Sequence, residues 1–108
     1  PAPLAVKFPA TVPLPLVEVA RVLLDADISV AVCHNAPANG GSSQAQTILH
    51  AAKGQLEVIG VGGVSSGAEA LAVLRHGITA IQIGSAVVKE GVSVFARLKR
   101  EMADSLEL

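Results

Sequence analysis

The chain has 108 residues, of which 51% are hydrophobic and only 2% aromatic, and its formal net charge at pH 7 is −1. This length allows one small domain or a piece of a larger one, and the charge leaves no basic stripe for a nucleic-acid partner. The apolar runs are shorter than the roughly 20 residues of a membrane span, and no signal peptide is recognised. One cysteine excludes an internal disulfide and fits a reducing, cytoplasmic compartment.

Strand and helix patterns alternate from the start of the chain. Residues 4–8 form a short apolar run stopped by Pro9, and residues 14–24 place apolar side chains around a helix. Residues 28–33 are a continuous apolar run with β-branched members, typical of a buried strand. Residues 34–43 contain Gly and Pro and are expected to form a loop.

The second half of the chain repeats the pattern. The expected elements are a helix over 44–52, a strand over 56–59, a helix over 68–75, a strand over 79–83 and a helix from about 92 to 105. Ser66 is a plausible N-cap with Glu69 three residues later, which is the order of a capping box. Gly54 and Gly77 are expected to end the helices that precede them.

Four such units indicate an α/β fold with parallel strands and right-handed crossovers. Val, Ile, Leu, Ala and Gly dominate, as in parallel strands that are buried on both faces. A full (β/α)8 barrel needs about 250 residues, so we interpret 1–108 as a single segment, the C-terminal half of a TIM (β/α)8 barrel. An open, doubly wound sheet of the flavodoxin-like kind is the alternative.

Glycine-rich junctions follow the last two predicted strands, at residues 60–67 and at Gly84-Ser85. Glycine lets a backbone approach a ligand closely, and a following helix offers free N–H groups and a positive dipole end to a phosphate. In (β/α)8 barrels the loops after strands seven and eight commonly bind phosphate. The alternatives are a tight turn without a ligand and simple packing at the barrel rim. Nicotinamide binding is disfavoured, because the spacing departs from G-x-G-x-x-G and no acidic residue follows at the required distance.

Polar residues at the ends of the first two strands are further candidates. Lys7 is a charge in an apolar strand, expected to point into the barrel mouth toward an anion, or else to extend outward past the strand. Asn35 offers both donor and acceptor groups to a planar ring, and we expect it, rather than His34, to face inward. Cys33 is expected to be buried and inert, and Gln82 to bond within the interior. The histidines lack supporting ligands, so no metal site is expected.

With these residues in view, the sequence resembles the dihydroorotate dehydrogenase family of flavin enzymes. Residues 58–70 look like its phosphate loop and helix, and residues 77–86 like its last strand signature. Residues 4–9 match the strand whose lysine lies against the flavin, and residues 32–35 the strand whose asparagine holds the pyrimidine. Residues 40–42 are similar to a glycine pair that contacts the flavin.

The resemblance implies FMN as the cofactor and a small dihydropyrimidine as the substrate, with hydride transfer from its C5–C6 bond in pyrimidine biosynthesis. The residues implied to bind FMN are Lys7, Gly40, Gly41, Gly62, Gly63, Gly84 and Ser85. Among these, Gly62, Gly63, Gly84 and Ser85 would hold the phosphate, and Lys7 would stabilise charge on the reduced ring. Asn35 would contact the substrate.

The sequence departs from the family pattern in two respects. Ser85 replaces a more usual threonine, and the loop between Asn35 and Gly40 is short enough to lack any further binding group. The family's general base lies in the N-terminal half, so no catalytic residue is expected here and the isolated chain is not expected to turn over.

Two other functions remain open. One is a non-catalytic half-barrel that binds or supports a partner. The other is a different flavin barrel, such as dihydropyrimidine dehydrogenase. A tRNA dihydrouridine synthase usually has an arginine after its second glycine, so Gly84-Ser85 and the lack of a basic surface count against that family. A half-barrel has open sheet edges, so we expect it to pair with an N-terminal half-barrel or with itself.

Overall fold

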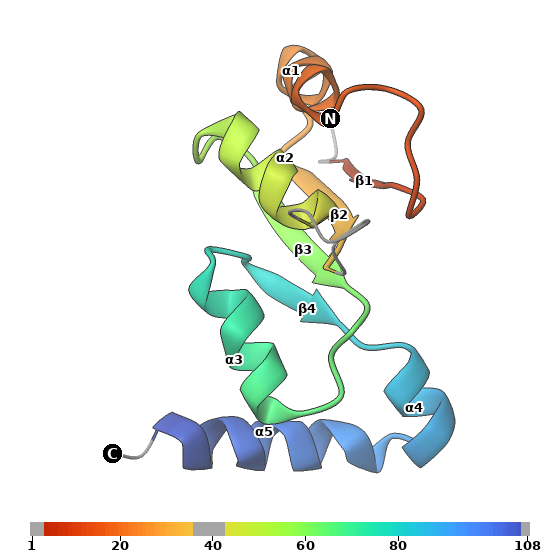
Figure 1. The fold of residues 1–108 in the computed structure, drawn as a ribbon, viewed down its shortest axis with the longest axis vertical. Helices are drawn as coiled ribbons and strands as arrows, with labels where there is room; N and C mark the ends of the chain where they lie inside the picture. The colour runs from red at the N-terminus through yellow and green to blue at the C-terminus, as the bar shows by residue number, and fades with distance from the viewer. Residues whose placement is uncertain (1–3, 36–42, 107–108) are drawn as a thin grey trace.

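The computed structural model describes residues 4–35 and 43–106. Within these ranges the strands are β1 (Ala5–Lys7), β2 (Val30–His34), β3 (Glu57–Val61) and β4 (Ala80–Gln82). The helices are α1 (Leu16–Asp25), α2 (Gln44–Ala52), α3 (Gly67–Arg75), α4 (Ser85–Glu90) and α5 (Ser93–Leu106). Every expected element is present with boundaries shifted by at most a few residues (Figure 1).

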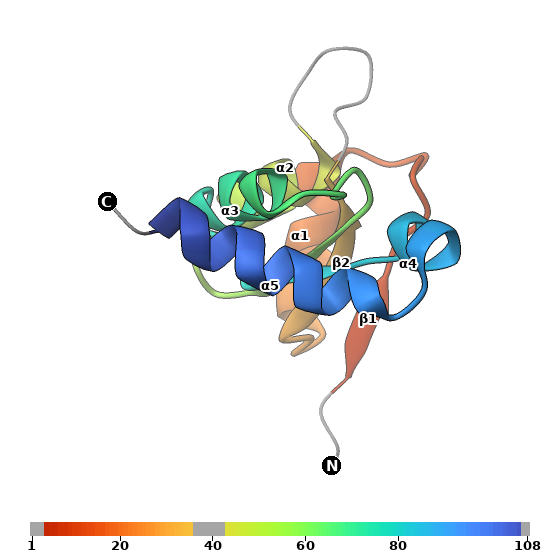
Figure 2. The same cartoon turned by 90° about the horizontal axis from the view of Figure 1, so that it is seen from below.

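Helix α4 is the one described element that the sequence pattern did not predict. It is six residues long, too short to show an amphipathic period, and it is bounded by Gly84 and by Gly91, whose φ is +79°. Gly91 separates it from α5, so the chain turns sharply between the two helices (Figure 2). None of the helices within the described ranges is long and apolar enough to cross a membrane.

The strands form one parallel sheet in the order β1-β2-β3-β4. A flavodoxin-like sheet reverses its strand order at a switch point, whereas this sheet adds each new strand beside the previous one. Consecutive order in one direction is the arrangement of a (β/α)8 barrel. The open doubly wound alternative is therefore wrong, and the four βα units form part of a barrel.

Helices α1 and α2 cover one face of the sheet. From the strands, Ala31, Cys33 and Val58 are fully buried on this face. The helix residues packed against them include Ala20, Leu23, Ala45, Ile48 and Ala52. These small and branched side chains bring the helices close to the strands, which explains the composition without large aromatics.

The opposite face of the sheet is the inner face of the partial barrel. The strand register sets two rows across it: Lys7, Val32, Ile59 and Ala80 in one, His34, Val61 and Gln82 in the next. Lys7, Ala80 and Gln82 are exposed. Gln82 was expected to bond within a closed interior; instead its side chain is exposed on this open face.

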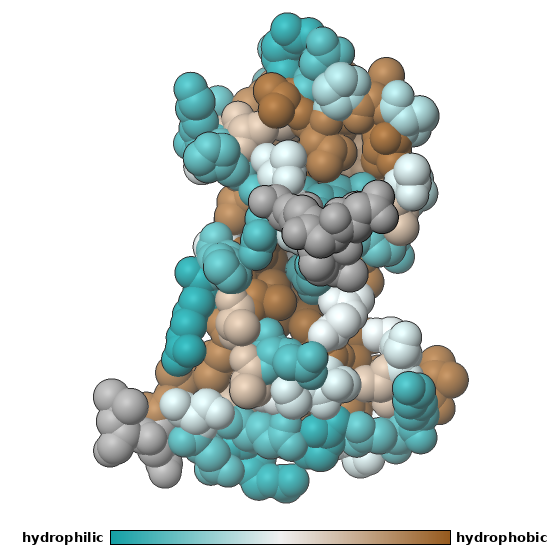
Figure 3. Space-filling view, in the orientation of Figure 1, coloured by the Kyte–Doolittle hydropathy of each residue, from teal (hydrophilic) through white to brown (hydrophobic). Residues whose placement is uncertain are grey.

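A second, smaller core lies between α4 and α5. Ala86, Val94 and Leu98 are buried there, and Ile83 packs against them from the end of β4. The outer side of α5 carries mainly polar atoms, and apolar atoms gather over α1 and β1 (Figure 3). Helix α5 thus has a polar outer side, and its buried side anchors α4 beside the end of the last strand.

Candidate phosphate site

The turn after β3 is open above two consecutive glycines. Gly62 and Gly63 have φ values of +92° and +73°, a backbone region that L side chains rarely adopt. A Cβ built on either glycine would meet no atom within 4 Å. The turn therefore presents bare backbone to open space, as a phosphate cradle requires.

The N-terminus of α3 is already occupied by the protein's own carboxylates. The Ser66 hydroxyl accepts a bond from the Glu69 N–H at 3.2 Å, which confirms the predicted cap. Glu69 in turn accepts from the Ser65 N–H and hydroxyl at 3.2 and 2.9 Å, and Glu101 accepts from the Gly67 N–H at 2.8 Å. The expectation that the α3 N-terminus offers free N–H groups to a ligand is therefore wrong for Gly67 and Glu69, because other side chains hold them.

A hollow of about 260 Å³ lies between the β3–α3 loop and α4. Its walls come from Gly63, Val64 and Ser65 on one side and from Ser85, Ala86, Lys89 and Glu90 on the other. Gly84, just before α4, would also leave a Cβ without neighbours within 4 Å. The structure thus brings both predicted glycine junctions to one hollow, and α4, which the sequence pattern did not predict, forms one of its walls.

Arg97 links the two walls of this hollow. Its guanidinium donates to the Ser65 carbonyl at 2.8 Å, to Glu90 at 2.9 Å and to Glu101 at 2.9 Å. No sequence pattern distinguishes Arg97 from the other basic residues of α5, and its role arises because the crossover brings the loop of Ser65 onto this helix. Glu90 and Arg97, seven residues apart and on different helices, gave no local signal.

The side chain of Asn35 lies across the end of β3. Its Nδ2 donates to the Gly62 carbonyl at 3.1 Å, and its amide occupies the space that a Cβ on Gly60 would fill. Strand alternation puts His34 in the inner row with Val61, whereas the Asn35 amide lies over Gly60, the register partner of the buried Cys33. The expectation that Asn35 rather than His34 faces inward is therefore wrong. Asn35 sits at the carboxyl end of β2 with its amide turned to the glycine turn.

Gln44 holds the carboxyl ends of β1 and β2 together. Its side chain accepts from the His34 N–H at 3.0 Å and donates to the Pro9 carbonyl at 2.9 Å. Lys7 at the end of β1 is exposed on the inner face, rather than directed toward the helices. Gln44 therefore fixes the relative positions of the strand ends that carry Lys7 and Asn35, a role that no sequence motif marks.

Three residues considered in the sequence analysis remain to be placed: Gly40, Gly41 and Cys33. Gly40 and Gly41 lie outside the described residues. Cys33 is fully buried, and burial raises the pKa of its thiol to about 11. The prediction that Cys33 is buried is therefore confirmed. Within the ranges 4–35 and 43–106, no three His, Cys, Asp or Glu side chains are grouped to hold a metal ion.

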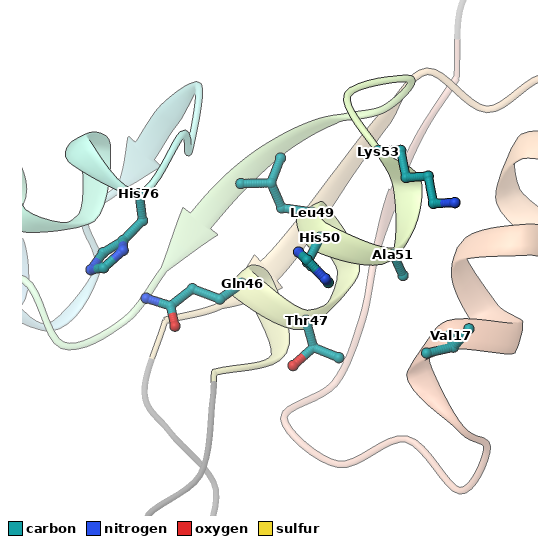
Figure 4. A pocket seen from close by; sticks show the side chains of 8 residues that line it. All are labelled: Val17, Gln46, Thr47, Leu49, His50, Ala51, Lys53 and His76. Carbon is teal, nitrogen blue, oxygen red and sulfur yellow. The ribbon is translucent and has the colours of Figure 1, made fainter.

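A larger hollow lies elsewhere, on the outer side of the helical layer. It measures about 980 Å³ and is lined by Val17 of α1, by α2 residues including Leu49 and His50, and by His76 (Figure 4). In Figure 4 these side chains come from separate helices and do not converge on one point. Of the predicted site residues that the structure describes, none lines this hollow, so the candidate site remains the smaller one at the strand ends.

The carboxylates around Arg97 titrate below their ordinary range. Hydrogen bonds from Arg97 lower the pKa of Glu90, those from the Gly67 N–H and Arg97 lower the pKa of Glu101, and bonds from Ser65 lower the pKa of Glu69. Their ionised forms are thus favoured in the folded state.

A carboxyl group whose pKa is lower in the folded than in the unfolded protein stabilises the folded state. This contribution is fully present above the unfolded pKa of about 4.3, and it is lost as the pH falls through the folded pKa. We expect the thermal unfolding midpoint to fall as the pH is lowered from 5 to 3, and to fall less in Arg97→Gln, which lacks the bonds to Glu90 and Glu101. Calorimetry across this range checks it; an equal fall in both proteins would contradict the contribution of these pairs.

A partial (β/α)8 barrel with two glycine turns around one hollow at its strand ends defines the class of this protein. A model of the family described as dihydroorotate dehydrogenase matches residues 43–106, more than half of the chain. The chain belongs to the dihydroorotate dehydrogenase family, as its motifs predicted.

Individual relatives agree with this assignment. The quinone-type dihydroorotate dehydrogenase of Rhodospirillum rubrum is 52% identical over 54 residues, which are 50% of this chain and 15% of that protein. The fumarate-type protein of Saccharomyces cerevisiae is 42% identical over 53 residues, 49% of this chain and 17% of that protein. The matched segment thus spans under a fifth of either relative.

Solved structures show the same fold over nearly the whole chain. The ligand-free DHODH of Eimeria tenella superposes with a TM-score of 0.77 at 18% identity, covering 94% of this chain and 35% of that one. The same protein in complex with ferulenol gives a TM-score of 0.75 at 17% identity, covering 96% and 34%. The chain therefore spans about a third of the length of these structures.

Proposed function

We propose that this chain is the FMN-phosphate-binding segment of a dihydroorotate dehydrogenase-type oxidoreductase. The observation that supports it best is the hollow of about 260 Å³ between Gly63 and Ser85. Two glycine turns with no atom near their Cβ positions suit a phosphate monoester, which needs close backbone approach. The oxidoreductase activity is inferred from membership of the dihydroorotate dehydrogenase family, and the relatives include both quinone and fumarate types.

Each residue of the proposed site is assigned a role according to the strand end at which it lies. The phosphate would be held by Gly62, Gly63, Gly84 and Ser85. Lys7 would face the flavin ring from the inner row, Gly40 and Gly41 would contact the flavin, and Asn35 would bind the substrate. FMN, when bound, supplies the acceptor for a hydride from the C5–C6 bond of dihydroorotate, giving orotate for pyrimidine biosynthesis. The general base would come from a segment outside residues 1–108, and the reaction would take place in the cytoplasm.

Filling the glycine cradle is expected to abolish tight FMN binding. Gly63→Val places a branched side chain in the hollow, and we expect FMN affinity to fall at least about tenfold by titration of flavin fluorescence. Gly54→Val is the matched control, because Gly54 also has a positive φ (+79°) and open space but lies in the turn after α2. Equal losses in both variants, or none in Gly63→Val, would argue against this phosphate site.

The segment is also proposed to work only when further strands complete its sheet. Among the described strands, β1 and β4 form the edges of the sheet and pair on one side only. An apolar hollow of about 290 Å³ beside β4 is lined by residues that include Ile81, Ile83, Phe95 and Leu98. Exposed edges and apolar surface of this kind favour pairing with another segment. The partner would be an N-terminal half-barrel or a second copy.

Sedimentation and intact mass test this completion directly. We expect a larger chain or a self-associated species that carries flavin absorbance. A cooperatively folded monomer of 10.9 kDa would contradict the proposal. A 10.9 kDa chain that self-associates without binding flavin would instead favour a non-catalytic half-barrel.

A further inference from the structure

The strongest unassigned feature near the proposed phosphate site is the bridge made by Arg97. One guanidinium reaches the Ser65 carbonyl in the β3–α3 loop and the Glu90 carboxylate at the end of α4. Ser65 and Glu90 line opposite walls of the hollow of about 260 Å³. Among the described residues, no other side chain forms hydrogen bonds to both walls.

The bridge is itself held rigid from a second side. Arg97 also donates to Glu101 at 2.9 Å, one helical turn further along α5, and the other oxygen of Glu101 accepts from the Gly67 N–H at 2.8 Å. Planar guanidinium groups bond several acceptors in fixed directions, which lysine does not. Arg97 therefore connects the loop directly to the end of α4, and it connects both to the start of α3 through Glu101.

The bridge also determines the charge of the hollow. Glu90 lines the hollow, and an unpaired carboxylate there would repel a phosphate dianion. The ion pair with Arg97 neutralises it, while Lys89 contributes a cation to the same wall. Loss of Arg97 would thus remove the bond to the Ser65 carbonyl, leaving the loop held by Glu69 alone, and would expose a negative charge beside the ligand.

We propose that Arg97 is a positioning residue for the phosphate site, which sets the separation of its two walls and masks Glu90. The inference rests on the proposed function, since it takes the hollow to hold the phosphate of FMN. Arg97 itself does not line the hollow, so it acts through Ser65 and Glu90 rather than by touching the ligand.

The test compares FMN with riboflavin, which has the same ring but no phosphate. Both affinities are measured on the purified protein, stripped of flavin, for wild type, Arg97→Gln and Arg97→Lys. We expect wild type to prefer FMN, and Arg97→Gln to lose at least about tenfold of this preference with little change for riboflavin. Arg97→Lys keeps the positive charge but lacks the planar guanidinium. We expect its preference for FMN to lie between those of wild type and Arg97→Gln.

A double variant separates charge from bridging. Combining Arg97→Gln with Glu90→Gln removes the repulsion by Glu90 but does not restore the bond to the Ser65 loop. The double variant should therefore recover part of the preference for FMN over riboflavin. Arg21→Gln, an exposed arginine of α1, is the charge-matched control and should keep the full preference. Equal losses of FMN and riboflavin in Arg97→Gln would mean a purely structural role and overturn the inference. A wild type that binds neither ligand would overturn the proposed function instead.

Discussion

A single methyl group at Gly60 is expected to disable the substrate contact proposed for Asn35. A Cβ on Gly60 would lie 2.8 Å from Cγ and 2.9 Å from Nδ2 of Asn35, closer than such atoms pack. Because these atoms end a flexible side chain, the Asn35 amide moves and the fold loses only about 1 kcal/mol. The displaced amide also loses its bond to the Gly62 carbonyl. We therefore expect orotate binding by Gly60→Ala to weaken about tenfold or more, as measured by calorimetric titration.

The double variant makes this expectation specific. In Asn35→Ala the colliding atoms are gone, so adding Gly60→Ala should cause no further loss of orotate affinity. The two substitutions are then strongly non-additive, which marks a direct contact. Additive losses would show that Gly60 affects binding by another route. Wild-type affinity in Gly60→Ala would exclude the role proposed for Asn35.

The largest loss of stability is expected from Gly67→Ala. A Cβ at Gly67 would lie 2.5 Å from Cβ of Glu101 and 2.6 Å from the backbone nitrogen of Met102. Backbone atoms of α5 cannot rotate away, so α3 and α5 must separate and the Gly67 N–H bond to Glu101 lengthens. Overpacking of this kind costs about 2–3 kcal/mol in the free energy of unfolding, which urea titration measures.

Gly84→Ala is the size-matched control for this experiment. It adds the same methyl group just before a helix, but no atom lies within 4 Å of its position. We expect its free energy of unfolding to stay within about 1 kcal/mol of wild type. If Gly67→Ala matched the control, the close approach of α3 to α5 would not exist in solution.

The elements governed by neighbouring residues could be predicted from the sequence. Helix α2 begins at Gln44 and ends at Ala52 as expected, because its apolar period and the glycine that follows are local features. The Ser66 cap and the parallel strands were predicted for the same reason. The glycine junctions that line the hollow were also visible, since each belongs to a single strand–helix turn.

Only the tertiary structure decided what those turns meet. Helix α4 was missed because six residues carry no clear period, and its place depends on packing against α5. Arg97 meets Ser65 across 32 positions of the chain, and Gly67 meets Glu101 across 34. Such contacts form only when right-handed crossovers stack successive units, so composition and spacing cannot show them. The sequence by itself determined the class of fold and its bare backbone turns, and the three-dimensional packing determined which side chains hold those turns in place.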